Sequence, residues 1–369
     1  MLPLVVESIS VRGFRNLVSV DVDFCPQFNV ISGDNGQGKT NLLESVYAVA
    51  TSRSFRTSKL GELIGIGGET ASARARIREG AQEREQSLGL RRGLRAVRID
   101  GKRPPTLAAY AVRTPTVVFH PGAVALSAGA GSERRTLLDR IALYISPSSI
   151  TEAASYAKAT RARQRVLEMR GDFAADLDGW EELIVRHGSA LSAARQDAAE
   201  ALMPAAENAF ARIGAPRMAL EARYRRNAPV EAEAFRSELV RHRARDRVRR
   251  SASVGPHRDD LVLTLAGLPV RGIASQGQHR AVVLALELAE IEVIAAARGV
   301  QPILLLDDVS SELDRERTVA LLSALHDRGG QVVLTTARPE LIDHVGREAG
   351  SGEQARRDFR VVSGQVAVA

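Results

Sequence analysis

The stretch GDNGQGKT at positions 33–40 holds the residues of this chain that are best suited to bind phosphate. It fits the spacing G-x-x-x-x-G-K-[ST], in which glycines let backbone N–H groups turn towards phosphate oxygens. In such a loop Lys39 reaches the β- and γ-phosphates of a nucleotide, and the hydroxyl of Thr40 ligates Mg²⁺. Average residue frequencies give about 0.01 chance matches in a chain of this length. The residues predicted to contact the nucleotide are Gly33, Asp34, Asn35, Gly36, Gln37, Gly38, Lys39 and Thr40.

Two carboxylates follow the apolar run ILLL at positions 303–306. Such a run is typical of a buried strand, and a phosphate-binding loop needs a carboxylate on a neighbouring strand to hold Mg²⁺. We therefore expect Asp307 to bind Mg²⁺ through water, and Asp308 to face the attacking water as a general base or polariser. Most of the chain separates these acids from Thr40, whereas small P-loop kinases and GTPases place the two motifs much closer together.

The elements that must position these residues come in three blocks. The first third alternates apolar and polar residues and predicts short strands, one of which leads into the loop at 33–40. Residues 133–250 are rich in Ala and Arg with helical spacing, which predicts four or five helices. The breaks between these helices are expected near Pro147, Gly171, Pro204 and Pro216. A strand near 259–270, a helix over 278–298, two further strands and a C-terminal hairpin complete an α/β block, so the helical part is an insertion.

The charge of the chain favours a polyanionic partner. The net charge is +7 and the pI is near 10.0, values that suit nucleic acid or a membrane surface, with a solvated basic face as the alternative. Cys25 is the only cysteine, which excludes a disulfide framework and a cysteine-based zinc site. The N-terminus lacks the features of a secretory leader, and no apolar run approaches membrane-spanning length. We therefore expect a cytoplasmic location.

The order of the motifs resembles that of ABC-type ATPases. SQGQH before a long helix resembles the signature turn, LLLDD resembles the Walker B strand and SSELD resembles the D-loop. The long stretch of chain between these motifs and the loop at 33–40 is similar to that in SMC and Rad50 heads. The stretches VRGFRNL, GDNGQGKTNLLES, SRSFR, VGPHRDDL and LLLDDVSSELD resemble the RecF family of recombinational repair ATPases. The similarity runs through both ends of the chain, and the helical middle matches mainly in length and texture.

This resemblance implies an α/β fold of the ABC-type P-loop ATPase head, with a mixed sheet and an antiparallel β-subdomain. A mainly helical second lobe is inserted, without a long coiled coil. The implied domains are lobe I at 1–122 and 296–369, with the phosphate loop, Walker B strand and D-loop, and lobe II at 123–295, with the signature turn.

The resemblance also implies an ATP-clamped homodimer. Ser275, Gly277 and Gln278 of one subunit would cover ATP held by the other, so that Ser275 acts in trans with Lys39 and Asp308. Asp314 would be the D-loop acid at the dimer seam, and Arg15 and Asn16 would lie near the ribose and phosphates. Many ABC-type ATPases have Glu in place of Asp308, which is consistent with slow turnover. Thr335 and Thr336 occupy the place of a common histidine, and His120 is only a stand-in for the Q-loop glutamine.

The implied activity is that of a weak, DNA-stimulated ATPase of DNA replication, DNA damage repair and the SOS response, using ATP and Mg²⁺. Its partners would be duplex, gapped or junction DNA, a second copy of itself, RecR, and indirectly RecO and RecA, with no membrane. The alternatives are the nucleotide-binding subunit of an ABC transporter, an SMC-like structural head and a small-molecule P-loop kinase. Low aromatic content (4%) favours DNA backbone contacts over base stacking. The candidate DNA-binding residues are Arg241, Arg243, Arg245, Arg249, Arg250, Arg91 and Arg92.

Overall fold

The computed structural model describes residues 1–213, 218–308, 325, 328–342 and 355–369. These form two compact units, one of Met1–Ala123 with Ile294–Ala369 and the other of Val124–Val293. None of the helices within the described part is long and apolar enough to cross a membrane.

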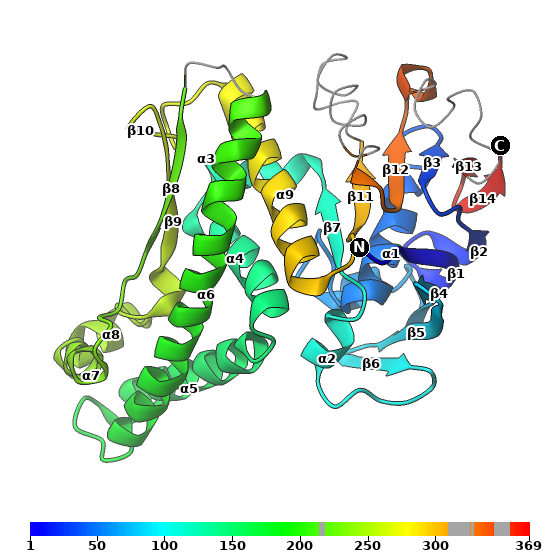
Figure 1. The fold of residues 1–369 in the computed structure, drawn as a ribbon. Coiled ribbons are helices and arrows are strands. Elements are labelled where there is room, and N and C mark those ends of the chain that lie inside the picture. The colour runs from blue at the N-terminus through cyan, green and yellow to red at the C-terminus, as the bar shows by residue number, and fades with distance from the viewer. Residues whose placement is uncertain (214–217, 309–324, 326–327, 343–354) are drawn as a thin grey trace. The chain divides into compact units, whose positions relative to one another are not determined.

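The first unit is built on a six-stranded sheet with the order β14-β13-β3-β12-β11-β7 (Figure 1). Its strands are β3 (Phe28–Ser32), β7 (Thr116–Phe119), β11 (Ile303–Asp307), β12 (Val332–Thr336), β13 (Arg356–Val362) and β14 (Gln365–Val368). All neighbours pair in parallel except β14, which forms an antiparallel hairpin with β13. The inner strands are apolar because a parallel sheet is covered on both faces. Their carboxyl ends meet at one edge, where the loop at 33–38 and Asp307 both lie.

A second, antiparallel sheet has the order β2-β1-β4-β5-β6. Its strands are β1 (Leu4–Phe14), β2 (Leu17–Asp23), β4 (Thr70–Glu79), β5 (Gln82–Arg91) and β6 (Leu94–Ile99). The alternating pattern of the sequence is confirmed, since every second residue of β4 is buried. Helix α1 (Lys39–Thr51) shares one apolar core with this sheet and with β3 and β11. Short elements complete the unit: η1 (Leu60–Leu63), α2 (Leu107–Ala111), η2 (Pro121–Val124) and η4 (Pro339–Ile342).

The second unit is mainly helical, as predicted. Its helices are α3 (Ala125–Ala128), α4 (Gly131–Ile145), α5 (Ser149–Arg170), α6 (Leu177–Ile213), α7 (Ala232–Arg241), α8 (Arg243–Arg249), η3 (Pro256–Arg258) and most of α9 (Gln276–Arg298). A small sheet, β10-β9-β8, contains β8 (Leu220–Arg225), β9 (Asp260–Leu265) and β10 (Leu268–Pro269). Helices α5 and α6 form an antiparallel hairpin around the turn after Gly171 (Figure 1).

Two details of this unit differ from the sequence-based prediction. Helix α6 runs unbroken through Pro204, so the break expected there was wrong. Proline removes one backbone hydrogen bond, but alanine-rich flanking turns and the buried side chains of Leu202 and Phe210 hold the helix together. The strand β8 was not predicted within the helical block. The break expected near Pro216 lies outside the described residues.

The motif GPHRDD forms a buried polar hub beneath this small sheet. The carboxylate of Asp259 accepts hydrogen bonds from Ser192, from Tyr224 and from the backbone N–H of Asn227. His257 lies 2.6 Å from the hydroxyl of Tyr156 through Nδ1 and 2.9 Å from a backbone carbonyl through Nε2. A neutral imidazole satisfies both contacts, and burial lowers the pKa of His257. The motif therefore has a clear structural role in this unit.

Candidate functional site

The loop between β3 and α1 adopts a backbone that glycine favours. Gly33, Gly36 and Gly38 have φ values of 147°, 80° and 120°. A Cβ atom at Gly38 would also lie 2.9 Å from Oδ1 of Asn16, so close approach and conformation both select glycine there. The N-terminus of α1 has no side-chain cap. Its first-turn N–H groups and the positive end of its dipole are therefore suited to an anion.

Lys39 lies inside this loop. Its ammonium donates hydrogen bonds to the carbonyl oxygens of Gly33, at 2.7 Å, and Asp34, at 2.9 Å. The side chain is mostly buried, and burial lowers the pKa of Lys39, although Asp308, Asp307 and Asp34 act in the opposite direction. The charge is thus held at the place where a phosphate group enters.

Asp307, the last residue of β11, lies between Thr40 of α1 and Thr335 of β12. Its Oδ1 accepts hydrogen bonds from the hydroxyls of Thr40 and Thr335, both at 2.8 Å. Burial raises the pKa of Asp307, and these two hydrogen bonds partly offset that effect. Oxygen donors of this kind fit Mg²⁺, which keeps several waters and takes one or two carboxylate or hydroxyl ligands from the protein. The donor set therefore fits the predicted ion.

A cavity of about 260 Å³ opens beside these residues. Its walls include Lys39, Thr40 and Asp308, which the sequence identified as site residues, and Thr335, which it placed where a histidine is common. They also include Asn41 and Arg56, to which the sequence gave no role. Asp308 has a φ of 50°, and its backbone N–H donates to the hydroxyl of Thr335 over 3.0 Å. The structure therefore brings the loop and Asp308 to one cavity of phosphate size, and Asp307 lies behind its wall, bonded to Thr40 and Thr335.

Arg56 is the main residue that sequence reasoning missed. Its guanidinium donates to Asn41 over 2.8 Å and pairs with buried Glu44 over 3.3 Å, and it remains 42% exposed at the cavity. The only signal was its place in the stretch SRSFR, which was noted for resemblance without a role. A second cation beside the loop suits a polyanionic ligand.

Arg15 and Asn16 lie on the β1–β2 turn, next to the loop. Arg15 makes a bidentate ion pair with Glu44 of α1, so its guanidinium is engaged by a carboxylate. Asn16 donates to the carbonyl of Gln37 over 3.1 Å and accepts from Asn41 over 2.8 Å. The structure thus places Asn16 against the loop itself, with Arg15 behind it.

The C-terminal hairpin supports the loop from behind. The backbone N–H groups of Ser363 and Gly364 donate to the side chain and carbonyl of Gln37. A Cβ atom at Gly33 would lie 2.5 Å from the carbonyl oxygen of Val361. Gln37 therefore anchors the loop to β13 and β14.

The signature turn lies in the second unit. Ser275 and Gln278 form a reciprocal capping box: the Ser275 N–H donates to Gln278 Oε1 over 2.7 Å, and the Gln278 N–H donates to the serine hydroxyl over 3.3 Å. No heavy atom lies within 4 Å of a Cβ built at Gly277, apart from its neighbours. The turn is thus an open helix N-terminus. Asp314 lies outside the described residues, and His120 packs against the ring of Phe55.

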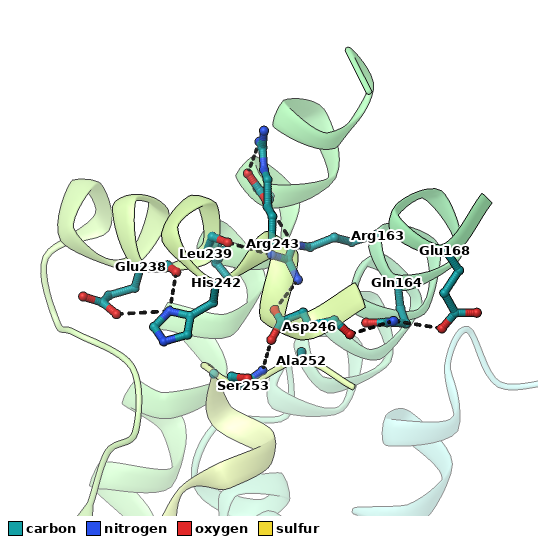
Figure 2. Close-up of polar contacts among 12 residues, drawn as sticks. Arg163, Gln164, Glu168, Glu238, Leu239, His242, Arg243, Asp246, Ala252 and Ser253 are labelled. Carbon is teal, nitrogen blue, oxygen red and sulfur yellow. Dashed lines mark hydrogen bonds and ion pairs between the residues drawn. The ribbon is translucent and has the colours of Figure 1, made fainter. Parts of the chain in front are cut away.

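The basic run at 241–250 is divided between structural and exposed arginines. Arg243 pairs with Asp178 and Glu181, each at 2.6 Å, and these carboxylates raise its pKa. Figure 2 shows Arg243 beside the fully buried Arg163, which pairs with Asp246 over 2.7 Å. Arg241 is exposed and pairs with Glu238. The arginines that are exposed and form no ion pair with a described residue are Arg245, Arg249 and Arg250.

Arg91 and Arg92 lie at the end of β5 and in the turn that follows it. Both are exposed, and neither forms an ion pair with a residue that the structure describes. Arg95 points to the other face of the sheet, where it donates to the carbonyl of Ser52 over 2.8 Å. The cluster therefore presents Arg91 and Arg92, rather than Arg95, to solvent.

Comparisons with known proteins show the family of the chain. Residues 5–356 match the family model of the RecF/RecN/SMC N terminal domain. The chain is 40% identical over 346 residues to the DNA replication and repair protein RecF of Anaeromyxobacter sp. (strain Fw109-5), covering 91% of this chain and 93% of the relative. It is 37% identical over 374 residues to RecF of Myxococcus xanthus (strain DK1622), covering 98% and 96%.

A solved structure of a RecF protein has the same fold as this chain. The structure described as the recombination mediator protein RecF-ATP in the RecFOR pathway superposes with a TM-score of 0.88 at 26% identity, covering 100% of this chain and 98% of the other. The predicted ABC-type head fold, with its mixed sheet, antiparallel sheet and helical lobe, is therefore confirmed.

Proposed function

The chain belongs to the RecF family of DNA replication and repair proteins, and from this premise we propose that it is a DNA-binding protein controlled by ATP and a slow ATPase. The observation that carries this proposal is that Lys39, Thr40 and Asp308 line one cavity, with Asp307 bonded to the hydroxyl of Thr40. The solved relative named RecF-ATP supports ATP as the nucleotide.

Each residue of the site has a distinct task. Lys39 supplies a point charge for the β- and γ-phosphates, and Arg56 adds a second cation at the cavity wall. Thr40 and Asp307 hold Mg²⁺, which when bound neutralises phosphate charge. Asp308 orients the attacking water and accepts its proton. The shorter side chain of Asp, compared with Glu, supports slow turnover.

We further propose that two copies clamp ATP between them. Ser275, Gly277 and Gln278 would contact the nucleotide of the other subunit, as would Asp314 at the dimer seam. The open helix N-terminus at Gly277 supports this role, because free N–H groups and the helix dipole favour a phosphate. The serine hydroxyl can cap its helix and still offer a lone pair or proton to a ligand.

DNA is the proposed partner of the dimer. Arg245, Arg249 and Arg250 on the helical unit, and Arg91 and Arg92 on the sheet, are exposed cations suited to phosphate. Arg241 and Arg243 contribute less because carboxylates engage them. We also propose RecR as a direct partner and RecO and RecA as indirect ones, with loading of RecA at gapped DNA and a cytoplasmic location. The name of the solved relative, which places it in the RecFOR pathway, supports this in part.

The three alternatives account for less of the molecule. A transporter subunit or a small-molecule kinase leaves the full-length similarity to RecF without explanation. An SMC-like structural head needs long coiled-coil arms, whereas the longest helix among the described residues has 37 residues.

Sedimentation velocity with and without ATP and duplex DNA tests the proposal. We expect a monomer without nucleotide, a dimer with Mg-ATP, and a larger complex when DNA is added. A chain that binds ATP and remains monomeric with DNA present would contradict it.

A further inference from the structure

The outward face of the antiparallel sheet carries a trough that the proposed ATP site does not use. Its floor is a row of small residues across three strands, in which Ser72 pairs with Gly89 and Gly89 pairs with Ala96. Arg12 of β1 extends the row as the partner of Ser72. The trough has a volume of about 620 Å³, in the range of pockets that take organic molecules rather than single ions.

Arginines and one exposed leucine form the rim. The next row of the sheet pairs Thr70 with Arg91 and Arg91 with Leu94, and the leucine is 67% exposed. Arg91 forms no ion pair within the described part of the chain. Arg12 is held in place by both carboxylate oxygens of Asp21, at 2.8 and 3.0 Å.

The next row of the sheet, beyond the lining of the trough, also carries cations. In this row Arg74 pairs with Ser87 and Ser87 with Arg98. Arg74 lies 3.6 Å from Glu85, and Arg98 donates to a backbone carbonyl over 2.9 Å. The trough thus has a floor with almost no side chains and, at its rim, the exposed cation of Arg91 beside the exposed Leu94.

We propose that this trough binds a single, unpaired DNA strand. Phosphates would contact Arg91, which no described carboxylate engages, and bases would lie over Gly89, Ala96 and Leu94. A duplex hides the faces of its bases and offers mainly phosphates, which would leave the apolar floor uncovered. An unpaired strand offers both surfaces. The inference rests on the proposed DNA-binding function and adds that one unit recognises the single-stranded part of a gapped substrate.

The length of the trough suits a short stretch of such a strand. Neighbouring strands of a sheet lie about 4.8 Å apart, so the row from Arg12 to Ala96 spans roughly 14 Å. A stacked DNA strand advances about 3.4 Å per nucleotide. The trough therefore has room for about two to four nucleotides.

Filling the floor tests the proposal without changing any charge. A Cβ atom at Gly89 would meet its nearest neighbour, the Ala96 carbonyl oxygen, at 3.9 Å, an ordinary contact, so Gly89→Leu fits the strand and projects into the trough. Gln82→Leu is the matched control, because Gln82 is exposed at the far end of the same strand. Ala96→Leu fills the same floor from the edge strand and replaces Gly89→Leu should that variant fail to fold.

Fluorescence anisotropy with labelled oligodeoxythymidylate and with blunt duplex, at one salt concentration, gives the readout. Gly89→Leu should weaken oligodeoxythymidylate binding at least about fivefold, equivalent to one lost base contact, and change duplex binding less than about twofold. Gln82→Leu should change neither. Arg91→Ala should reduce the salt slope for the single strand by about 0.7. Thermal unfolding and ATP binding verify that each variant is folded.

Three results would overturn the inference. Unchanged oligodeoxythymidylate binding in both floor variants removes the trough from DNA recognition. Equal losses for single strand and duplex make the face a general DNA surface. Displacement of oligodeoxythymidylate by polyglutamate at equal charge points to an acidic protein partner. Each of these leaves the proposed function standing, whereas a wild-type chain that binds no DNA in any nucleotide state contradicts that function itself.

Discussion

The hydroxyl of Thr40 donates a hydrogen bond to Oδ1 of Asp307 over 2.8 Å, although the two residues lie 267 positions apart. Thr335 donates to the same oxygen from the strand between them in the sheet. The first turn of α1, which follows β3, and the carboxyl ends of β11 and β12 therefore meet at one carboxylate. The loop at 33–40 and the acidic end of β11 therefore form one candidate Mg-ATP site.

Lys39→Met should abolish nucleotide binding. The methionine keeps most of the apolar stem but removes the charge that lies among the loop carbonyls. Isothermal titration with an ATP analogue measures the effect, and Lys59→Met, a change at an exposed lysine, is the control. Normal affinity in Lys39→Met would show that this loop is not the nucleotide site.

Asp308→Asn should slow hydrolysis and spare binding, because Asp308 acts on water rather than on the metal. We expect a turnover number at least about tenfold lower, with ATP affinity unchanged and dimer accumulating in ATP. Asp307→Asn is the contrast and should weaken Mg²⁺-dependent binding instead. Wild-type turnover in Asp308→Asn removes this residue from the chemical step.

Acidification should destabilise the helical unit through His257. Burial lowers the folded-state pKa of His257, so the unfolded chain binds the proton more readily. The stability that the neutral ring contributes is present above its unfolded pKa, about 6.5, and is lost as pH falls towards the lowered folded value. Melting temperature measured from pH 8 to 5 should fall more steeply in wild type than in His257→Gln. Parallel curves would exclude His257 as a source of this pH dependence.

DNA affinity should fall steeply with salt and depend little on sequence, because arginine–phosphate contacts release counterions. Replacing Arg249 and Arg250 with alanine should reduce the slope of log K against log salt by up to ~2. Arg243→Ala should lower the free energy of unfolding by about 1–2 kcal/mol, because buried Glu181 loses one arginine and keeps Arg163, and should alter the slope little. A wild-type slope near zero would contradict the claim that arginine contacts with DNA phosphates supply most of the affinity.

The sequence predicted elements with strong local signals. The loop at 33–40 has a pattern that few other structures satisfy, the apolar run of β11 gains its meaning from that loop, and β4 alternates cleanly. Helix α6 shows the limit of such signals: Pro204 predicted a break, but the packing of its flanking turns outweighs one lost hydrogen bond. Local pattern cannot report that packing.

The sequence predicted the motifs of the candidate site but not the residues that support them. Arg56 contacts the cavity only because Glu44 and Asn41 orient it, and these partners are known only from the fold. Arg243 read as one cation of a basic run, but Asp178 and Glu181 reach it from a helix more than sixty residues earlier in the chain. Charge runs show where cations are and not which carboxylates approach them.

The central claim is that Ser275 of one subunit completes the ATP site of another. Ser275→Arg should leave ATP binding to the monomer nearly intact, since Lys39 and Asp307 lie in the other unit of the chain. It should prevent dimer closure, because a bulky cation replaces a small hydroxyl at a close-packed seam, and hydrolysis should fall.

Mixing Ser275→Arg with Lys39→Met gives the most direct measurement of this claim. A heterodimer of the two has one composite site with both lesions and one site with neither. Once heterodimers are verified by differential tagging, the account predicts partial recovery of ATPase activity that neither variant shows alone. Verified heterodimers that stay inactive, together with loss of ATP binding by Ser275→Arg alone, would place Ser275 in its own subunit's site and contradict the clamp.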